Sequence, residues 1–141
     1  MTKINLASHA AYEMDARKGL SVLRQLFDAG ENFHFQTTAG GELAMEHLFF
    51  QFYLKQVRET GKNQFLAVET EENLILKSLE SMEMIGCGVK LLPVDRDGLI
   101  DLEALKRAIG PKTALLSISA VCALTGTVQP VNEILKICRE Q

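Results

Sequence analysis

The sequence lacks the features that would point to a membrane, a nucleic acid or secretion. It has no run of about 20 apolar residues, which a membrane-spanning helix requires. Its net charge is −3 and it has no block of basic residues, which argues against nucleic acid as a partner. The N-terminus, residues 1–5, lacks the apolar core of a signal peptide. We therefore expect a cytoplasmic protein that binds neither membranes nor nucleic acids.

Cysteine is scarce, and the common nucleotide-binding motifs are missing. Cys87, Cys122 and Cys138 are an odd number, and their spacing is not that of metal ligands. They fit reduced thiols in a cytosol better than a disulfide framework. The three histidines have no common spacing either, so we expect no metal site. The chain also lacks the three-glycine dinucleotide fingerprint and the Gly-Lys-Ser/Thr phosphate motif.

What the chain does contain is 141 residues of ordinary globular composition, 47% hydrophobic and 23% charged. This length predicts one domain, residues 1–141, that needs no disulfide to hold its core. Hydrophobic spacing predicts helices at residues 10–27, 43–58, 71–85, 102–109 and 131–138. Strands are predicted at residues 64–69, 89–94 and 114–119, with a short one through Phe33 and Phe35. The alternation predicts a three-layer α/β/α fold with a mainly parallel sheet.

Several residues predict where the elements begin and end. Gly61 is expected to stop the helix of residues 43–58. Thr70 and Asp101 are expected to cap the two helices that follow them. Residues 95–98, Asp-Arg-Asp-Gly, have the composition of a turn. The acidic cluster Glu69, Glu71 and Glu72 is interpreted as a solvated turn at a helix N-terminus.

The carboxyl ends of parallel strands meet at one edge of the sheet, where ligands of open α/β folds bind. Three loops are expected there, at residues 37–41, 70–73 and 119–129. Gly40 and Gly41 would let the backbone take positive φ, and the N–H groups of the following helix could hold a phosphate. The alternative is an ordinary strand-to-helix turn.

Several runs of sequence resemble one known family. Residues 89–106 contain Val94-Asp95-Arg96-Asp97-Gly98, and residues 126–131 read Gly-Thr-Val-Gln-Pro-Val. Together with residues 113–119, 37–42 and 5–9, in the same order, they resemble the cysteine desulfurases. These are class V aminotransferase-like proteins that use pyridoxal phosphate (PLP).

The resemblance implies that the chain is part of the large domain of a PLP-dependent transferase fold. It implies a family activity that removes sulfur from L-cysteine for iron–sulfur or thio-cofactor assembly. It also implies a homodimer and a sulfur-acceptor protein as partners. Relative to the family, the chain stops before the cofactor-pairing Asp, the Schiff-base Lys and the mobile-loop Cys, so we assign no catalytic residue.

Inside the matched region the cofactor contacts depart from the family. Gly41 stands where the family has a phosphate-binding threonine, and Glu72 stands where it has a histidine that stacks on the ring. The asparagine that bonds the ring hydroxyl becomes Cys122 or Ala123. Gln129 is a further candidate to face the site. The resemblance thus places candidate cofactor contacts at Thr38, Ala39, Gly40, Gly41, Glu72, Cys122 and Gln129.

These departures leave three interpretations open. The first is a desulfurase-like chain that does not turn over by itself. The second is a non-catalytic family member that serves as a binding or assembly module. The third is another class V activity, such as an aminotransferase or a lyase. For Cys122 a small buried apolar role competes with a reactive thiol. An exposed sheet edge predicts self-association by edge pairing or swapping.

Overall fold

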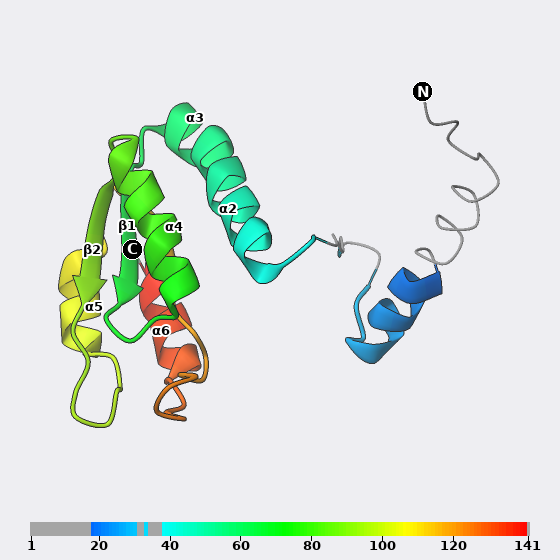
Figure 1. The fold of residues 1–141 in the computed structure, drawn as a ribbon. Coiled ribbons are helices and arrows are strands. Elements are labelled where there is room, and N and C mark those ends of the chain that lie inside the picture. Colours follow the sequence, from blue (N-terminus) through cyan, green and yellow to red (C-terminus); the bar gives the residue numbers. More distant parts are fainter. Residues whose placement is uncertain (1–17, 31–32, 34–37, 141) are drawn as a thin grey trace. The chain divides into compact units, whose positions relative to one another are not determined.

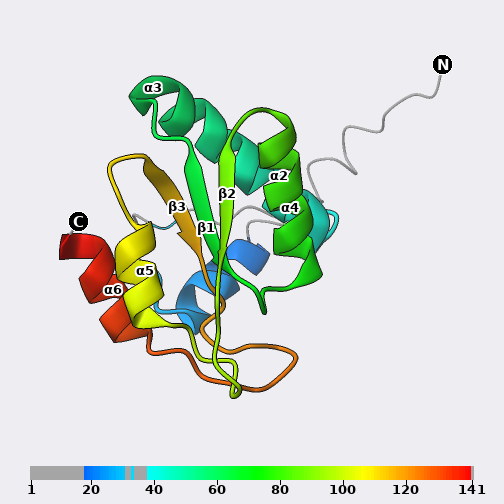
Figure 2. The same cartoon turned by 90° about the vertical axis from the view of Figure 1, so that its left-hand side faces the viewer.

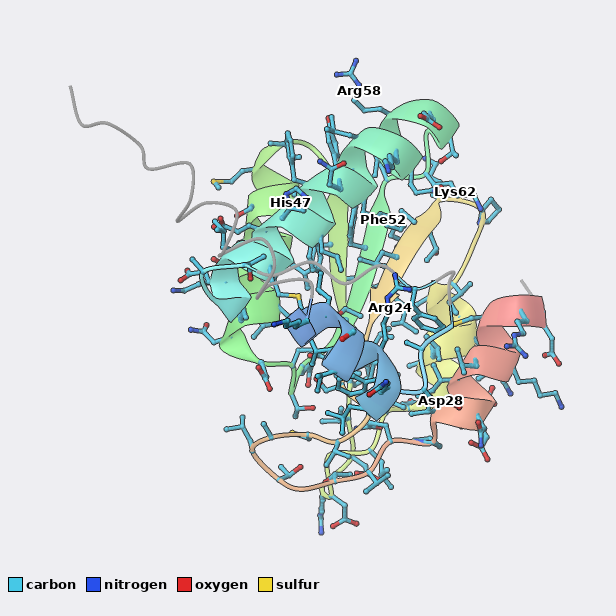
Figure 3. The ribbon with its side chains drawn as sticks, turned by 90° about the vertical axis from the view of Figure 1, so that its right-hand side faces the viewer. Arg24, Asp28, His47, Phe52, Arg58 and Lys62 are labelled. Carbon is cyan, nitrogen blue, oxygen red and sulfur yellow. The ribbon has the colours of Figure 1, made fainter. Side chains whose placement is uncertain are left out.

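The computed structural model describes residues 18–30, 33 and 38–140, and its contacts divide the chain into two units, residues 1–37 and 38–141. In the first unit residues 18–26 are helical, as expected for that part of the helix predicted over 10–27. Arg24 donates a hydrogen bond to the carbonyl oxygen of Phe33 at 3.2 Å (Figure 3). Phe33 is not in a strand, and Phe35 lies outside the described residues. The expected single domain stays a prediction.

The second unit is built on a parallel sheet of three strands with helices on both faces (Figure 1). The strands are β1 (Gln64–Val68), β2 (Gly88–Leu92) and β3 (Thr113–Ser117), in the order β2-β1-β3. Gln64 of β1 pairs with Gly88 on one side and with Thr113 on the other. The predicted three-layer α/β/α fold and its parallel sheet are confirmed.

Two pairs of helices cover the two faces of the sheet (Figures 1 and 2). One face carries α2 (Gly41–Phe52) and α4 (Asn73–Met84), and the other carries α5 (Leu102–Ala108) and α6 (Val131–Glu140). After α2 the helix continues through a wide π-helical segment, η1 (Tyr53–Val57), into α3 (Arg58–Thr60). Gly61 ends this run at φ 73°, which confirms its predicted role as a stop. No helix among the described residues is long and apolar enough to cross a membrane.

Strand β1 is the centre of the unit because its side chains belong to the hydrophobic clusters on both faces of the sheet. Phe65 and Ala67 face α2 and α4, whereas Leu66 and Val68 face α5 and α6. All four are at most 2% exposed. Phe52 extends the first layer, with its ring edge-on to Phe65 at a centroid distance of 6.2 Å (Figure 3). Each large buried side chain contributes about 1.5–3 kcal/mol, so this strand is where substitutions cost most.

Two predicted boundaries were wrong for local reasons. Strand β2 ends at Leu92, not at Val94, because Pro93 has no N–H to donate to a ladder. Val94 instead forms an isolated antiparallel bridge with Ile100. Helix α4 begins at Asn73, and no side chain caps it, so the expected cap by Thr70 does not form.

Two other local predictions are confirmed. The Asp101 carboxylate accepts hydrogen bonds from the N–H groups of Glu103 and Ala104, both at 2.9 Å, and so caps α5. The Asp95 carboxylate accepts from the N–H groups of Asp97 and Leu99 and so closes the predicted turn. Both patterns are set by neighbours within four residues, which is why sequence reveals them.

Candidate functional site

The glycine-rich turn before α2 leaves its backbone donors without a side-chain acceptor. Gly40 is the N-cap residue, and its φ of 179° is extended backbone that any residue adopts. Neither Gly40 nor Gly41 lies in the left-handed region that favours glycine, so that expectation was wrong. The Thr38 hydroxyl donates to the carbonyl oxygen of Gly40 at 2.8 Å instead of accepting from the helix. The first N–H groups of α2 therefore lack a side-chain cap, and residues 38–41 are all exposed.

Glu71, in the loop after β1, is buried and tied to the loop after β3. Its carboxylate accepts hydrogen bonds from the backbone N–H and the hydroxyl of Ser119, at 2.5 and 2.9 Å. Only 4% of Glu71 is exposed, so its interpretation as part of a solvated turn was wrong. The carboxylate joins two loops that lie 48 residues apart in the sequence. The parallel register of β1 and β3, which pairs Ala67 with Ser117, is the signal that would have placed 71 and 119 near each other.

The two residues that flank Glu71 have different environments. Glu72 is exposed, and its carbonyl oxygen accepts hydrogen bonds from the N–H groups of Ile75 and Leu76 in the first turn of α4. Its side chain makes no capping hydrogen bond. Thr70 is partly buried, and its hydroxyl oxygen is covered and has no hydrogen-bond partner among the described residues. The side chain of Glu72 is thus exposed to solvent at the end of this loop, just before α4.

Cys122 lies in a hairpin that covers the end of the sheet. The hairpin is closed by backbone hydrogen bonds from Cys122 N–H to Thr127 O and from Gln129 N–H to Ala120 O. The thiol is 3% exposed and donates to the carbonyl oxygen of Thr70 at 3.6 Å. The polar groups beside the thiol, first the Thr125 hydroxyl and then the N–H groups of Thr125 and Leu124, hold the pKa of Cys122 below its ordinary value. The Cys122 thiol is thus covered and engaged with the backbone of the loop after β1.

Gln129 was expected to face the site, but both ends of its amide are engaged elsewhere. Its oxygen accepts from the N–H of Ile100 at 3.1 Å, and its nitrogen donates to the carbonyl oxygen of Gly98 at 2.7 Å. The residue is 4% exposed. Gln129 therefore fixes the hairpin to the turn at residues 95–98.

The same turn is held by a close contact at Gly98. Its φ of +83° is one that side chains rarely adopt, and an added Cβ would lie 3.3 Å from the hydroxyl oxygens of both Thr125 and Thr127. The Thr127 hydroxyl donates to the carbonyl oxygen of Asp97. Figure 2 shows the two loops, lime and orange, beyond the same ends of the strands. Sequence reasoning identified the turn but not its contact with the hairpin.

The structure thus brings together two of the three predicted loops and adds a third element, the turn at 95–98. Thr70 meets Cys122, Glu71 meets Ser119, and Gln129 spans to Gly98. The turn before α2 lies near the start of α4, because a Cβ on Gly41 would be 3.5 Å from the Leu74 side chain.

The residues at this edge fit only part of a PLP cofactor. Uncapped N–H groups at the start of α2 suit a phosphate, but Glu42 in that first turn adds a negative charge. Glu72 adds an exposed carboxylate just before α4, and the amide of Gln129 is already satisfied. Cys122 donates to backbone and offers no amide to a ring hydroxyl. No group of His, Cys, Asp and Glu within the described part of the chain is arranged to hold a metal.

The comparisons with known proteins agree with this architecture. The family model "Aminotransferase class-V" matches residues 23–141. The "Probable cysteine desulfurase, mitochondrial" of Dictyostelium discoideum is 43% identical over 103 residues, which cover 73% of this chain and 22% of the relative. The chain therefore spans about a fifth of the length of this curated relative.

Solved structures with the same fold are also much longer than this chain. A "NifS-like protein" matches with a TM-score of 0.65 and 26% identity, covering 70% of this chain and 27% of the other. DndA from Streptomyces lividans matches with a TM-score of 0.65 and 25% identity, covering 72% and 28%. On the family match, the parallel sheet and these likenesses, the chain belongs to the class V aminotransferase family, and its relatives include cysteine desulfurases.

Proposed function

We propose that the chain carries the sheet-and-loop part of a desulfurase-type PLP domain and does not turn over cysteine by itself. The observation that carries the desulfurase assignment is the 43% identity to a probable cysteine desulfurase over 103 residues. The activity to which such a domain contributes is PLP-dependent removal of sulfur from L-cysteine for iron–sulfur or thio-cofactor assembly. When bound, PLP supplies the electron sink for that chemistry.

The absence of turnover follows from the side chains at the strand ends. A PLP enzyme needs a lysine beside the cofactor. No lysine occurs in residues 38–41, 70–73, 95–101 or 119–129. By resemblance, Glu72 stands for the histidine that stacks on the ring, and Cys122 or Ala123 stands for the asparagine that bonds it. The Glu72 carboxylate is exposed and the Cys122 thiol is covered. What remains for a cofactor is the uncapped start of α2, which is a phosphate-binding feature and not a catalytic one.

The test is a sulfide-release assay on the 141-residue chain with PLP and L-cysteine. We expect no release above the protein-free control, and turnover would refute the proposal. A parallel titration with PLP, followed by absorbance, measures binding separately from catalysis. Weak binding without an internal aldimine band is expected; a lysine aldimine would refute it.

The second candidate is a non-catalytic binding or assembly module, and the same three positions favour it. Restoring the family residues with Gly41→Thr, Glu72→His and Cys122→Asn distinguishes the two. A desulfurase scaffold that lost its contacts is expected to bind PLP about tenfold more tightly in the triple variant, as two regained hydrogen bonds and one stacking contact would give. A module with an unrelated role predicts no change. Another class V aminotransferase or lyase activity remains the third candidate, to be tested with amino-acid substrates other than cysteine.

The partners expected from the family are a second copy of the chain and a sulfur-acceptor protein. Strands β2 and β3 are both edges of the sheet, and an open edge favours pairing with another chain. Light scattering over a concentration series tests the dimer, which a sharp monomer mass throughout would exclude. Cytoplasmic location also stays a proposal, since the relative from Dictyostelium carries a mitochondrial name.

A further inference from the structure

A groove runs between α2 and α4, from Glu42 and Leu74 near the starts of the two helices to Met84 at the end of α4. It consists of two adjoining hollows of about 310 and 260 Å³ that share Glu46, Ser78 and Ser81. Phe50 lines one hollow and Met84 lines the other. We call this feature the α2–α4 groove. Nothing in the proposed desulfurase chemistry uses it.

The floor of the groove is formed by small serine side chains whose hydroxyl donors are already engaged. The Ser78 hydroxyl donates to the carbonyl oxygen of Leu74 at 3.0 Å, and the Ser81 hydroxyl donates to that of Lys77 at 3.1 Å. Both hydroxyls donate to carbonyl oxygens of their own helix, so a partner that covers them leaves neither donor without an acceptor. A bulky apolar side chain of a partner can therefore enter above them at little polar cost.

The walls of the groove expose large apolar side chains. Phe50 is 51% exposed and Met84 is 82% exposed. Aromatic and methionine side chains are enriched at interfaces, since both offer large contact area and Met adapts its shape. Leu43 and Leu54 extend the apolar stripe of Phe50 along the same helical run, at 54% and 37% exposure.

The rim of the groove is acidic. Glu42, Glu46 and Glu80 line it, against the single cation Lys77. None of the three glutamates has an ion-pair partner among the described residues. Carboxylates beside an apolar groove select a partner with cations beside an apolar stripe.

We propose that the α2–α4 groove is a docking site for a cationic amphipathic helix of a partner protein. The groove is walled by two helices, which is the geometry that accepts a third helix through anchors at i, i+3, i+4 and i+7. An extended strand would find no sheet edge there, since the groove lies in the helical layer. A second copy that used this same face would set glutamates opposite glutamates, because a two-fold interface pairs a patch with itself.

The probe is a fluorescent peptide of leucine, alanine and lysine, about 18 residues long so that it holds a helix once docked. Its binding to the whole 141-residue chain is followed by anisotropy at about 0.15 M ionic strength, which screens loose charge attraction. A peptide with glutamate in place of every lysine is the matched control. We expect saturable binding of the lysine peptide and at least tenfold weaker binding of the glutamate peptide, the effect of reversing several rim charges.

Variants of the chain locate the site. The pair Glu46→Lys and Glu80→Lys reverses the rim, and Ser81→Phe fills the floor. The control Glu133→Lys makes the same kind of charge change on α6, on the opposite face of the sheet. We expect the groove variants to lose about tenfold or more in affinity and Glu133→Lys to lose less than twofold.

Hydrogen exchange of the unaltered chain keeps the test independent of variant folding. Protection by the lysine peptide is expected in α2 and α4 alone. The proposal is overturned by absent binding, by equal loss in Glu133→Lys, by protection elsewhere, or by a self-association that the groove variants abolish. None of these outcomes depends on PLP or sulfide release, so the proposed function and this proposal fail separately.

Discussion

The carboxylate of Glu71 gives the sharpest test of how the strand-end loops are held. Glu71→Ala removes the acceptor for two hydrogen bonds, from the backbone N–H and the hydroxyl of Ser119. Each hydrogen bond to a charged group stabilises by about 1.5–3 kcal/mol, and Glu71 accepts two. Removing the buried carboxylate also removes the cost of burying it, which offsets part of this loss. We therefore expect Glu71→Ala to lower the free energy of unfolding by about 2–4 kcal/mol.

The measurement is urea unfolding followed by far-ultraviolet circular dichroism, since the chain has no tryptophan. Glu71→Gln keeps an acceptor for the Ser119 N–H and is expected to lose about 1 kcal/mol. Glu72→Ala is the matched control, because that exposed side chain makes no capping bond, and it is expected to change stability by less than about 0.5 kcal/mol.

A double-mutant cycle with Ser119→Ala isolates the contact itself. Residues that share a hydrogen bond show coupling of about 0.5–3 kcal/mol, whereas distant residues are additive. Two outcomes would refute a stabilising contact between Glu71 and Ser119. One is that the losses of stability in the two single variants add up in the double variant, and the other is that Glu71→Ala lies within about 0.5 kcal/mol of the parent.

Three further predictions use other parts of the same edge. Gly98→Ala is expected to lose about 2–3 kcal/mol by chemical unfolding, because it adds a tight contact to a strained φ, whereas Gly61→Ala, with open space around it, is expected to lose only about 1 kcal/mol; equal losses would contradict the contact. Gln129→Leu leaves the buried N–H of Ile100 and carbonyl oxygen of Gly98 without a partner, so the free energy of unfolding is expected to fall by about 1–3 kcal/mol. An unchanged free energy of unfolding would show that these two hydrogen bonds do not stabilise the fold. In a variant with Cys122 as its only thiol, thiolate absorbance is expected to rise at a pH below that of an ordinary thiol, and Thr125→Val is expected to move the midpoint upward; an unmoved midpoint would refute the hydrogen bond. Because the folded-state pKa is the lower one, the thiolate stabilises the fold at high pH, and this contribution is lost as pH falls through the folded-state pKa.

Much of the fold follows from local patterns in the sequence. The apolar run of residues 65–68 predicts a strand covered on both faces, and its four side chains are indeed buried on both. The cap at Asp101 and the stop at Gly61 depend on backbone groups a few residues away, which is why each was predictable. Pro93 shortens β2 by a rule that also acts locally, so this proline is the sequence signal for that boundary.

The candidate site was less predictable because its contacts are distant in sequence. Ser119 lies 48 residues from Glu71, and Gly98 lies 31 residues from Gln129. Residue type alone predicts that a glutamate in an acidic cluster is exposed to solvent. The opposite expectation, burial, comes only from the register of β1 with β3, which brings the loops after the two strands together. Thr70 illustrates the same limit, since its hydroxyl is covered and caps nothing among the described residues, while its carbonyl oxygen accepts from the thiol of Cys122, 52 residues away in the sequence.

The central position of β1 has a consequence for synthesis on the ribosome. Its neighbour β2 comes soon after it in the chain, but β3 emerges only once α5 has been made. Until then one flank of the most apolar strand stays unpaired, and contacts that must wait for distant segments slow folding. A nascent chain halted before β3 is thus the stage at which a holdase chaperone would be needed most, and residues 64–68 are the segment it would shield.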